Sequence, residues 1–366
     1  MSLVFLVFIG EKAYSEEVAG KEHHGAEKQE LNVRELILDH VSDAYEWHIA
    51  TFGEKHYSIP LPVIVKGEES GWHVFSSAKF HHGHESYNGF SIAEEGDYKG
   101  KIIETLSSGE EIRPYDFSIT KNAFSLILSS IVLIILILSC SAWYKKKERK
   151  PENASPNGFV AFVELIIMSI VDDVIKPCVG KNYKRYTPYL LTIFFFIIFI
   201  NLLGLVPIFP GGANVTGNIA ITFILALCTF TLTNFFGTKE YWKEIFLPDV
   251  PHWLKPIMIP VELLGIFTKP FALMIRLFAS ILAGHALLLG LTCIVFLTVR
   301  LGVALNTGMT VFSVVLSVFS NFVEILVAYI QAYVFTMLSS IYFGLSQVEP
   351  HHAPKSPKGD FGEAQL

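Results

Sequence analysis

Residues 186–238, 53 in a row, contain no Asp, Glu, Lys or Arg, and this stretch constrains the fold more than any other feature. A bilayer core about 30 Å thick needs roughly 20 mostly apolar residues in a helix, so the stretch is long enough for two crossings. It is interrupted near its middle by Pro207, Pro210, Gly211, Gly212 and Asn214. The pattern predicts two membrane-spanning helices, about 187–207 and 216–237, joined by a tight turn.

Three further apolar segments are long enough to lie in a membrane. They cover about residues 123–143, 254–299 and 302–347. The last two are longer than a perpendicular helix requires, and a strong tilt accommodates the excess length. Only 17% of the residues are charged, against about 25% in soluble globular proteins. We therefore predict a mainly α, polytopic membrane protein with five membrane-embedded helices, including a long, strongly tilted pair.

The segment 158–180 differs from these because charged residues interrupt it. Its apolar residues recur at helical spacing, and Glu164, Asp172, Asp173 and Lys176 lie between them. This pattern predicts an amphipathic helix that lies at the membrane interface instead of crossing. A packing helix buried within the protein is the alternative.

Lys and Arg gather on one side of the predicted spans, and cytoplasmic loops are the ones enriched in these residues. The basic loops are 145–150, 176–185 and 239–255, and Lys355 and Lys358 lie in the C-terminal tail. Five crossings then place the N-terminus outside the cytoplasm and make residues 349–366 a cytoplasmic tail.

The first third of the chain is chemically different from the rest. Residues 1–120 hold 10 Lys and Arg against 21 Asp and Glu, whereas residues 121–366 hold 18 against 13. Residues 1–15 resemble an incomplete export signal, with a short apolar run and no basic start. We predict an extracytoplasmic acidic domain at 16–120, followed by a membrane domain at 121–348.

Short strand-like runs and histidines mark the acidic domain. The runs Tyr57–Val65 and Trp72–Ser77 predict some β-structure. Nine of the 13 histidines lie here, including His81, His82 and His84. A His-rich tract can bind transition metals, but no cysteine or second ligand set accompanies this one, so solvated surface histidines are favoured. We predict no metal and no cofactor, and the net charge of −6 without a basic patch argues against nucleic-acid binding.

Ionisable side chains inside the apolar segments cost at least about 2.5–3.5 kcal/mol each, so each one is a candidate functional residue. Four of them follow one another at intervals of seven residues: Lys255, Glu262, Lys269 and Arg276. Seven residues turn through about 700°, close to two full turns, so the four share one helical face. Lys255 and Lys269 are equally well explained as charges that reach the cytoplasmic interface. For Arg276 the alternative is a structural pair with Glu262 or Glu324.

Four more polar residues complete the set of candidates. Ser280 lies four residues beyond Arg276, and His285 lies on the opposite side of the same predicted helix. Glu324 is the one charged residue of the last apolar segment, and Gln331 shares its face two turns further on. His285 and Glu324 can take up and release protons once burial and neighbours adjust them.

A fixed cation cannot relay a proton by losing its own, because Arg stays charged at any accessible pH. It can attract a mobile carboxylate and favour the ionised form of that group, which forces its proton off. One such cation, a titratable His and Glu pair, and a polar row toward the cytoplasm predict a proton route with a gate in its middle.

Two other function classes remain open on these residues. One is a self-contained, ion-coupled secondary transporter, which usually shows inverted repeats, and no internal repeat occurs here. The other is an intramembrane metalloenzyme that uses His285 and Glu324, although the sequence has no His-Glu-x-x-His cluster.

Three stretches of the sequence resemble subunit a of F-type ATP synthases. The first is Pro260–His285, whose core reads Arg-Leu-Phe-Ala-x-x-x-Ala-Gly. The second is Glu324–Phe335, and the third is Asn201–Pro207 followed by Ala213–Thr216. The resemblance implies a stator subunit of the membrane sector of a bacterial enzyme, located in the bacterial plasma (inner) membrane. This subunit would couple proton flow to ring rotation and ATP synthesis. Its partners would be a c-ring, the peripheral-stalk b subunits, the lipid bilayer and protons as the transported ion.

The resemblance also implies roles for individual residues. Arg276 would face the carboxylate of the c-ring, with Gln331 close to it. Glu262 would line the cytoplasmic half-channel, and His285 with Glu324 would form the ionisable pair of the other half-channel.

Ser280 and Lys269 are predicted to belong to the same proton path. The chain itself would not be catalytic, because the nucleotide chemistry would lie in partner subunits. No Gly-x-x-x-x-Gly-Lys-[Ser/Thr] loop occurs in this sequence.

Overall fold

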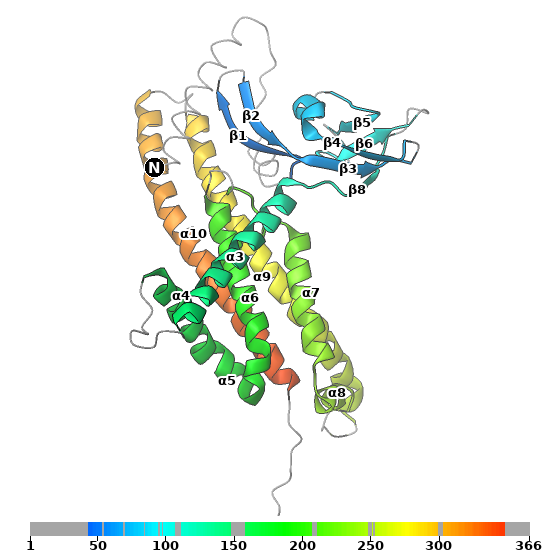
Figure 1. Ribbon diagram of the computed structural model, residues 1–366, viewed down its shortest axis with the longest axis vertical. Coiled ribbons are helices and arrows are strands. Elements are labelled where there is room, and N and C mark those ends of the chain that lie inside the picture. Colours follow the sequence, from blue (N-terminus) through cyan, green and yellow to red (C-terminus); the bar gives the residue numbers. More distant parts are fainter. Residues whose placement is uncertain are drawn as a thin grey trace, which may run out of the picture.

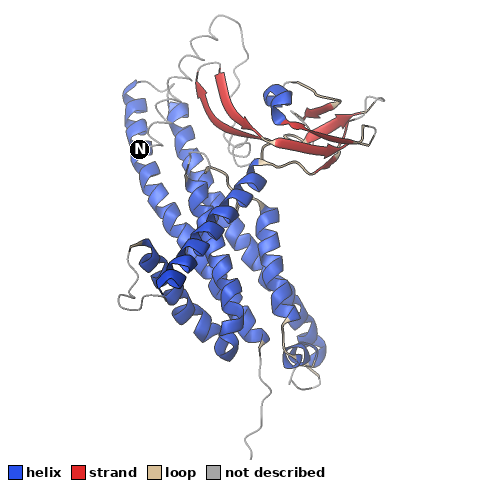
Figure 2. Cartoon of the chain, in the orientation of Figure 1, coloured by secondary structure: helices blue, strands red, loops and turns tan. Residues whose placement is uncertain are grey.

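A computed structural model of the chain contains a strand-rich N-terminal domain, residues 43–120, and a bundle of long helices (Figures 1 and 2). The structure describes residues 43–52, 55–68, 70–83, 85–93, 96, 98–106, 111–147, 158–206, 211–247, 251, 253–298 and 303–347. The export signal predicted at 1–15 and the cytoplasmic tail predicted at 349–366 lie outside these residues, as does His84.

Five long helices form the described part of the bundle. They are α3 (Lys121–Lys147), α6 (Tyr183–Leu205), α7 (Ile219–Phe235), α9 (Lys255–Thr298) and α10 (Val303–Ser346). Along the bundle α3 packs on α6, α6 on α10, α10 on α9 and α9 on α7. α6 begins four residues before its predicted start, because Lys184 and Arg185 extend the helix beyond its apolar run.

Among the described residues, four helical runs are long and apolar enough to cross a membrane. These are Lys121–Lys145, Phe159–Leu205, Lys255–Val295 and Leu305–Ser346. The number becomes five if α7 and the short α8 (Lys239–Phe246), which is bent by 98° from it, together form one span. The chain is therefore a mainly helical, polytopic membrane protein.

α9 and α10 are antiparallel partners of 44 residues each, which corresponds to about 66 Å. Pro260 and Pro270 lie inside α9 without ending it. Where the two helices join, the Ser313 hydroxyl donates to the Leu291 carbonyl at 2.5 Å, and the Thr298 hydroxyl lies 3.1 Å from Asn306 Oδ1. A helix of this length exceeds a bilayer core of about 30 Å, and its tilt in the membrane stays a prediction.

Between α3 and α6 the chain forms α4 (Phe159–Ser169), a π-helical turn (Ile170–Ile175) and α5 (Lys176–Val179), and it then turns at Gly180. The first half exposes Phe159, Phe162 and Leu165, whereas Val174, Ile175 and Val179 are buried. α10 approaches closely, since a Cβ on Gly344 would collide with the backbone of Cys178. This segment is amphipathic and packs by its second half on the bundle; its position at a membrane interface stays a prediction.

The bundle core lies where α6, α9 and α10 meet. Its largest fully buried side chains include Leu190, Phe194, Ile197, Leu273, Leu277 and Phe343. Tyr186 stacks on Phe343 with ring centroids 4.6 Å apart. Because lipid tails are as apolar as these side chains, close packing holds such helices together more than exclusion from water does.

The N-terminal domain contains three small antiparallel sheets. Its strands are β1 (Glu46–Phe52), β2 (Lys55–Pro60), β3 (Pro62–Lys66), β4 (Trp72–Ser76), β5 (Phe90–Ile92), β6 (Ile102–Thr105), β7 (Glu111–Ile112) and β8 (Tyr115–Asp116). β1 pairs with β2, and the other sheets have the orders β4-β3-β8 and β5-β6-β7. The run expected as one strand at Tyr57–Val65 is two strands, because the chain passes from one sheet to another between Pro60 and Pro62.

Alternation of buried and exposed residues orients the β4-β3-β8 sheet. In β3, Val63 and Val65 are completely buried, and the residues between and beside them are not. The two valines pack in a core with Phe80, Phe90 and Ile102. The period-2 pattern gives this sheet one buried and one outward face.

One buried tryptophan joins the N-terminal domain to the helices. Trp47 of β1 is 3% exposed and packs with Ile200 at the end of α6 and Val215 before α7. Its ring meets Phe124 of α3 edge-on at 5.8 Å. The backbone amides of Lys121 and Asn122 also donate to Ala44 O and Asp43 Oδ1, so the domain is attached to the start of α3 and to the α6–α7 connection.

Candidate functional site

The predicted polar row lies on one continuous helix, α9, and ends at a free arginine. Arg276 is exposed on the surface of the bundle, and its side chain makes no ion pair or hydrogen bond with any described residue. The structural pair with Glu262 or Glu324 considered above therefore does not form among the residues that the structure describes. An unpaired guanidinium on an apolar helix is costly in lipid, so this face is suited to a partner with negative charge.

Small side chains surround this arginine on its own helix. Ala272, Ala279 and Ala283 lie four residues before it and three and seven after it, and all three are exposed. Small residues at such spacing let another helix come close. The guanidinium thus lies among small side chains, on a surface that another helix can approach.

Gln331 of α10 lies near the level of Arg276. His285 of α9 contacts Glu324 of α10, which fixes the register of the two antiparallel helices. Nine residues before His285 on α9 is Arg276, and nine residues after Glu324 on the antiparallel α10 is Tyr333. Arg276 and Tyr333 therefore lie at about the same level, and Gln331 is two positions from Tyr333. Gln331 is half-buried, and it lies within one helical turn of the level of the arginine.

His285 and Glu324 are brought together across the α9–α10 contact. Nδ1 of His285 is 3.6 Å from Oε1 of Glu324, with the carboxylate side chain 5% exposed and the imidazole 20% exposed. The carboxylate oxygens accept no hydrogen bond from the described residues. Gly284 gives the carboxylate its space, since a Cβ there would lie 2.9 Å from Oε1.

Ser280 is placed differently from the other predicted site residues. Its hydroxyl donates to the Arg276 carbonyl at 2.8 Å and approaches the Leu277 carbonyl at 3.2 Å. The side chain is therefore bonded to its own helix, between the level of the arginine and that of the His285–Glu324 pair.

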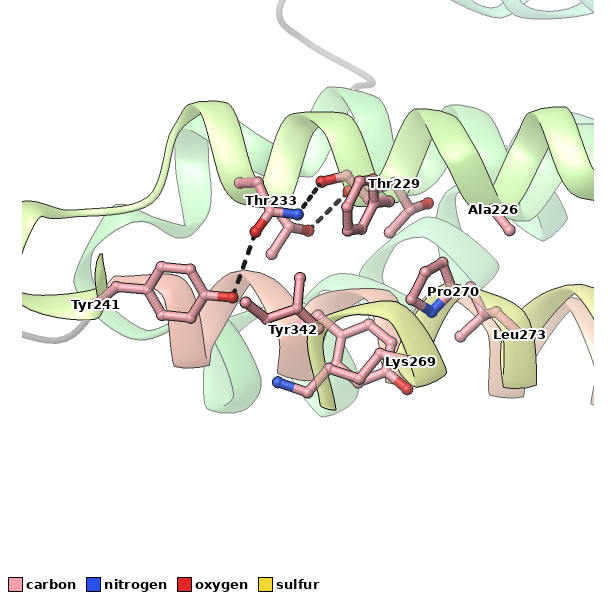
Figure 3. A pocket seen from close by; sticks show the side chains of 11 residues that line it. Ala226, Thr229, Thr233, Tyr241, Lys269, Pro270, Leu273 and Tyr342 are labelled. Carbon is pink, nitrogen blue, oxygen red and sulfur yellow. Dashed lines mark hydrogen bonds between the residues drawn. The ribbon is translucent and has the colours of Figure 1, made fainter. Parts of the chain in front are cut away.

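A pocket between α7, α8, α9 and α10 lies on the other side of Arg276 along α9 (Figure 3). Polar side chains line much of it: Thr229, Thr233, Asn234, Tyr241, Lys269 and Tyr342. The Lys269 ammonium lies 5.8 Å from the centre of the Tyr342 ring. The pocket is partly open to its surroundings and encloses about 20 Å³ of space that water can occupy.

Hydrogen bonds within the pocket walls hold most of its polar groups in place. The Thr233 hydroxyl donates to the Thr229 carbonyl at 2.7 Å, and the Asn234 amide to the Phe230 carbonyl at 2.8 Å. Asn234 Oδ1 also faces the Tyr241 hydroxyl at 3.5 Å (Figure 3). Glu262, two turns before Lys269 on α9, is half-buried, and Lys255 at the start of α9 is also half-buried.

The structure therefore separates the predicted residues into two groups with Arg276 between them. The His285–Glu324 pair lies about 13.5 Å from the arginine along α9, and Glu262 lies about 21 Å away in the other direction. The α7 and α8 walls of the pocket were not predicted from the sequence. The spacing of Thr229 and Thr233 by four residues within an otherwise apolar stretch was the available signal.

Comparison with known proteins places this arrangement in a family. A family model described as "ATP synthase A chain" matches residues 126–344, which include α6, α7 and α9 and nearly all of α10. The chain belongs to this family. A second model, described as "Domain of unknown function (DUF8433)", matches residues 36–117 and so covers the N-terminal domain.

Individual relatives agree with this family assignment. The chain is 41% identical over 240 residues to "ATP synthase subunit a 2" of Chlorobaculum tepidum, covering 64% of this chain and 65% of that protein. It is 42% identical over 244 residues to "ATP synthase subunit a" of Chlorobium phaeobacteroides (65% and 68%). It is 39% identical over 245 residues to "ATP synthase subunit a" of Myxococcus xanthus (65% and 75%). The match thus spans 65% of the first relative's length.

Proposed function

We propose that this chain is the proton-translocating stator subunit of the membrane sector of an F-type ATP synthase. The observation that carries the proposal is the exposed, unpaired Arg276 on α9. The His285–Glu324 pair lies to one side of it along the helix, and the polar pocket at Lys269 lies to the other. Two polar regions separated by a fixed cation provide two half-channels. Each half-channel would lead to the c-ring, and the two would not connect directly with each other.

The first half-channel uses the His285–Glu324 pair. A buried carboxylate that faces an imidazole can receive a proton and pass it on, because both are groups that bind and release protons. Protons would enter from the side of the α9–α10 connection and reach the carboxylate of a c-ring subunit at the level of Arg276. Gln331 would help to position that carboxylate through its amide.

Arg276 acts on the c-ring carboxylate as a fixed charge. A guanidinium near a carboxylate favours the ionised form of that group, so a protonated ring carboxylate that arrives after nearly one rotation releases its proton. The same positive charge repels free protons and prevents a direct leak between the half-channels. Each proton that moves down 100 mV supplies about 2.3 kcal/mol, so several are needed for each ATP.

The second half-channel uses the pocket at Lys269 and leads to Glu262. Polar side chains of α7, α8, α9 and α10 line the pocket, and they would let water enter an otherwise apolar bundle. Glu262, two turns further toward the start of α9, is suited to receive the released proton. Nucleotide chemistry is assigned to partner subunits, and the peripheral-stalk b subunits would hold this chain against the torque of the ring.

The distribution of basic residues supports an orientation for this route. Lys176, Lys184, Arg185, Lys239 and Lys243 all belong to α5, the start of α6, or α8. In Figure 1 these elements lie at the end of the bundle opposite the N-terminal domain. Cytoplasmic segments are the ones enriched in Lys and Arg, so we place the N-terminal domain and the α9–α10 connection outside the cytoplasm.

The decisive experiment replaces the arginine in the assembled complex. Arg276→Ala is expected to abolish ATP-driven proton pumping in inverted membrane vesicles, while passive proton leak through the membrane sector is kept or increased. Arg276→Lys is the matched control, because it keeps a cation but loses the planar guanidinium, and it is expected to retain more coupling. Pumping by Arg276→Ala near the wild-type rate would refute the proposed mechanism.

A further inference from the structure

The outward face of the β4-β3-β8 sheet carries large apolar side chains that nothing in the described chain covers. Trp72 is 61% exposed, Val74 71%, Tyr115 67% and Phe117 61%. We call these four residues the aromatic face. The opposite side of the same sheet is the domain core, so the exposure is confined to one side.

Strand register makes the aromatic face one continuous patch. Lys66 of β3 pairs with Trp72 on one side and with Tyr115 on the other. Val74 pairs with Ile64, whose carbonyl accepts the Phe117 amide at 2.9 Å. The Trp72 and Phe117 rings are 5.7 Å apart. Contiguous exposed apolar patches of this kind usually mark an interaction surface.

The patch lies next to the membrane-embedded part of the chain. Phe117 is four residues before Lys121, the first residue of α3, and four residues span at most about 14 Å. The amide of Ile119 still bonds to the Pro62 carbonyl of β3 at 3.1 Å, so the sheet continues almost to the helix. In Figure 1, β8 is the strand of this sheet nearest the helices, and β5 lies on the far side.

We propose that the aromatic face rests on the headgroup region of the bilayer that α3 crosses. Trp and Tyr are the residues enriched at membrane–water interfaces, where one end of the ring is apolar and the other is wet. Lys66 lies in the same row with its ammonium 5.9 Å from the Trp72 ring, which is suited to a lipid phosphate. No carboxylate occurs on the outward positions of β3 and β4, which are 62, 64, 66, 72, 74 and 76.

Continuity with α3 favours lipid over a protein occupant. α3 itself exposes apolar side chains such as Ile127 and Ile131, 48% and 49% exposed, which must contact lipid or another membrane helix. The aromatic face extends this apolar surface into the interfacial layer, which adds about 5–7 Å on each side of the hydrocarbon core. The inference requires only that α3 lies in the membrane, and it does not depend on the proposed proton route.

Quenching of Trp72 in the full chain, reconstituted in phosphatidylcholine vesicles, tests the proposal. The difference between wild type and Trp72→Phe isolates this residue from the other four tryptophans. We expect the Trp72 emission to be largely lost when the lipid carries bromine near the headgroup end of an acyl chain. We also expect iodide in the aqueous phase to quench it poorly. Full quenching by iodide with no effect of brominated lipid overturns the proposal.

Two further measurements separate the other possible occupants. Shielding from iodide that disappears when the chain is diluted in lipid overturns the proposal in favour of a second copy. Shielding that occurs only in the assembled ATP synthase overturns it in favour of another subunit. Tyr115→Ser with Phe117→Ser is expected to reduce the bromine quenching of Trp72. Tyr98→Ser, which changes a 41%-exposed tyrosine outside this sheet, is the matched control and is expected to leave the quenching unchanged.

Discussion

Gly284→Ala tests whether the position of the Glu324 carboxylate matters for proton movement. The added Cβ would lie 2.9 Å from Oε1 of Glu324, whereas ordinary contact begins at 3.4 Å, so the oxygen must move by about 0.5 Å. The His285–Glu324 distance of 3.6 Å is already beyond the usual 2.7–3.2 Å of a hydrogen bond. Displacement of the carboxylate therefore weakens the contact between Glu324 and His285.

The expected effect is on transport and not on stability. Ala is favoured over Gly in a helix interior by about 0.8–1 kcal/mol, and the displaced atom is the end of a flexible side chain, so α9 remains folded. A positioned proton-transfer group contributes about 10²–10⁴-fold to a rate. The displaced carboxylate keeps part of this contribution, so we expect a fall of about tenfold, equivalent to about 1.4 kcal/mol in the barrier.

The assay is ATP-driven acidification of inverted vesicles that contain the assembled complex. Gly290→Ala is the matched control, because the same change on the same helix meets no atom within 4 Å. Gly284→Ala combined with Glu324→Asp removes one methylene and is expected to recover part of the rate. Equal pumping by the Gly284 and Gly290 variants would show that the carboxylate position is unimportant. A parallel loss of thermal stability would also contradict the explanation.

Two predictions concern the N-terminal domain. Trp47→Ala is expected to weaken the attachment of the domain to the helices by about 3–5 kcal/mol, as for other truncations of a buried Trp. Hydrogen exchange of the backbone amides at 211–218 should then become faster, whereas Tyr98→Ala, at an exposed tyrosine, should leave it unchanged. Unchanged exchange in Trp47→Ala would contradict the role of Trp47 in attaching the domain. Burial, with the hydrogen bond that Tyr45 donates to Asp116, raises the pKa of Tyr45 above its usual value of 10.0. The contribution of the protonated Tyr45 to the free energy of unfolding is therefore fully present below pH 10, and it is lost as the pH rises further. Denaturant titrations should therefore show a steeper alkaline loss for wild type than for Tyr45→Phe, and Tyr115→Phe should behave as wild type.

The bundle was predictable because membrane thickness imposes a length on apolar helices. The seven-residue spacing from Lys255 to Arg276 placed those residues on one face, and α9 keeps that face because neither proline ends the helix. The pairing of His285 with Glu324 came from resemblance to a family, since periodicity within one helix contains no information on which helix lies opposite.

Features that depend on contacts between distant segments were missed for the same reason. The Thr233 and Tyr241 walls of the pocket require α7 and α8 to fold back on α9, and the sequence of each helix alone does not specify that. The N-terminal domain was predicted to contain strands, but its order β4-β3-β8 joins segments about fifty residues apart. Its attachment to the helices through Trp47 depends on a contact surface that forms only after the N-terminal domain and the helix bundle have both folded.

The Trp47 contact has a mechanical consequence for α3. Along its length α3 packs mainly against α6, and a single helix held along one side can swing about that line of contact. The N-terminal domain continues directly into α3 and is also fixed to residues at the end of α6 and before α7. α3 is therefore held in two ways, by its packing on α6 and, at its N-terminal end, by the attached domain. A sideways force on its far end must break the tryptophan contact as well as the helix packing before α3 can separate from the bundle.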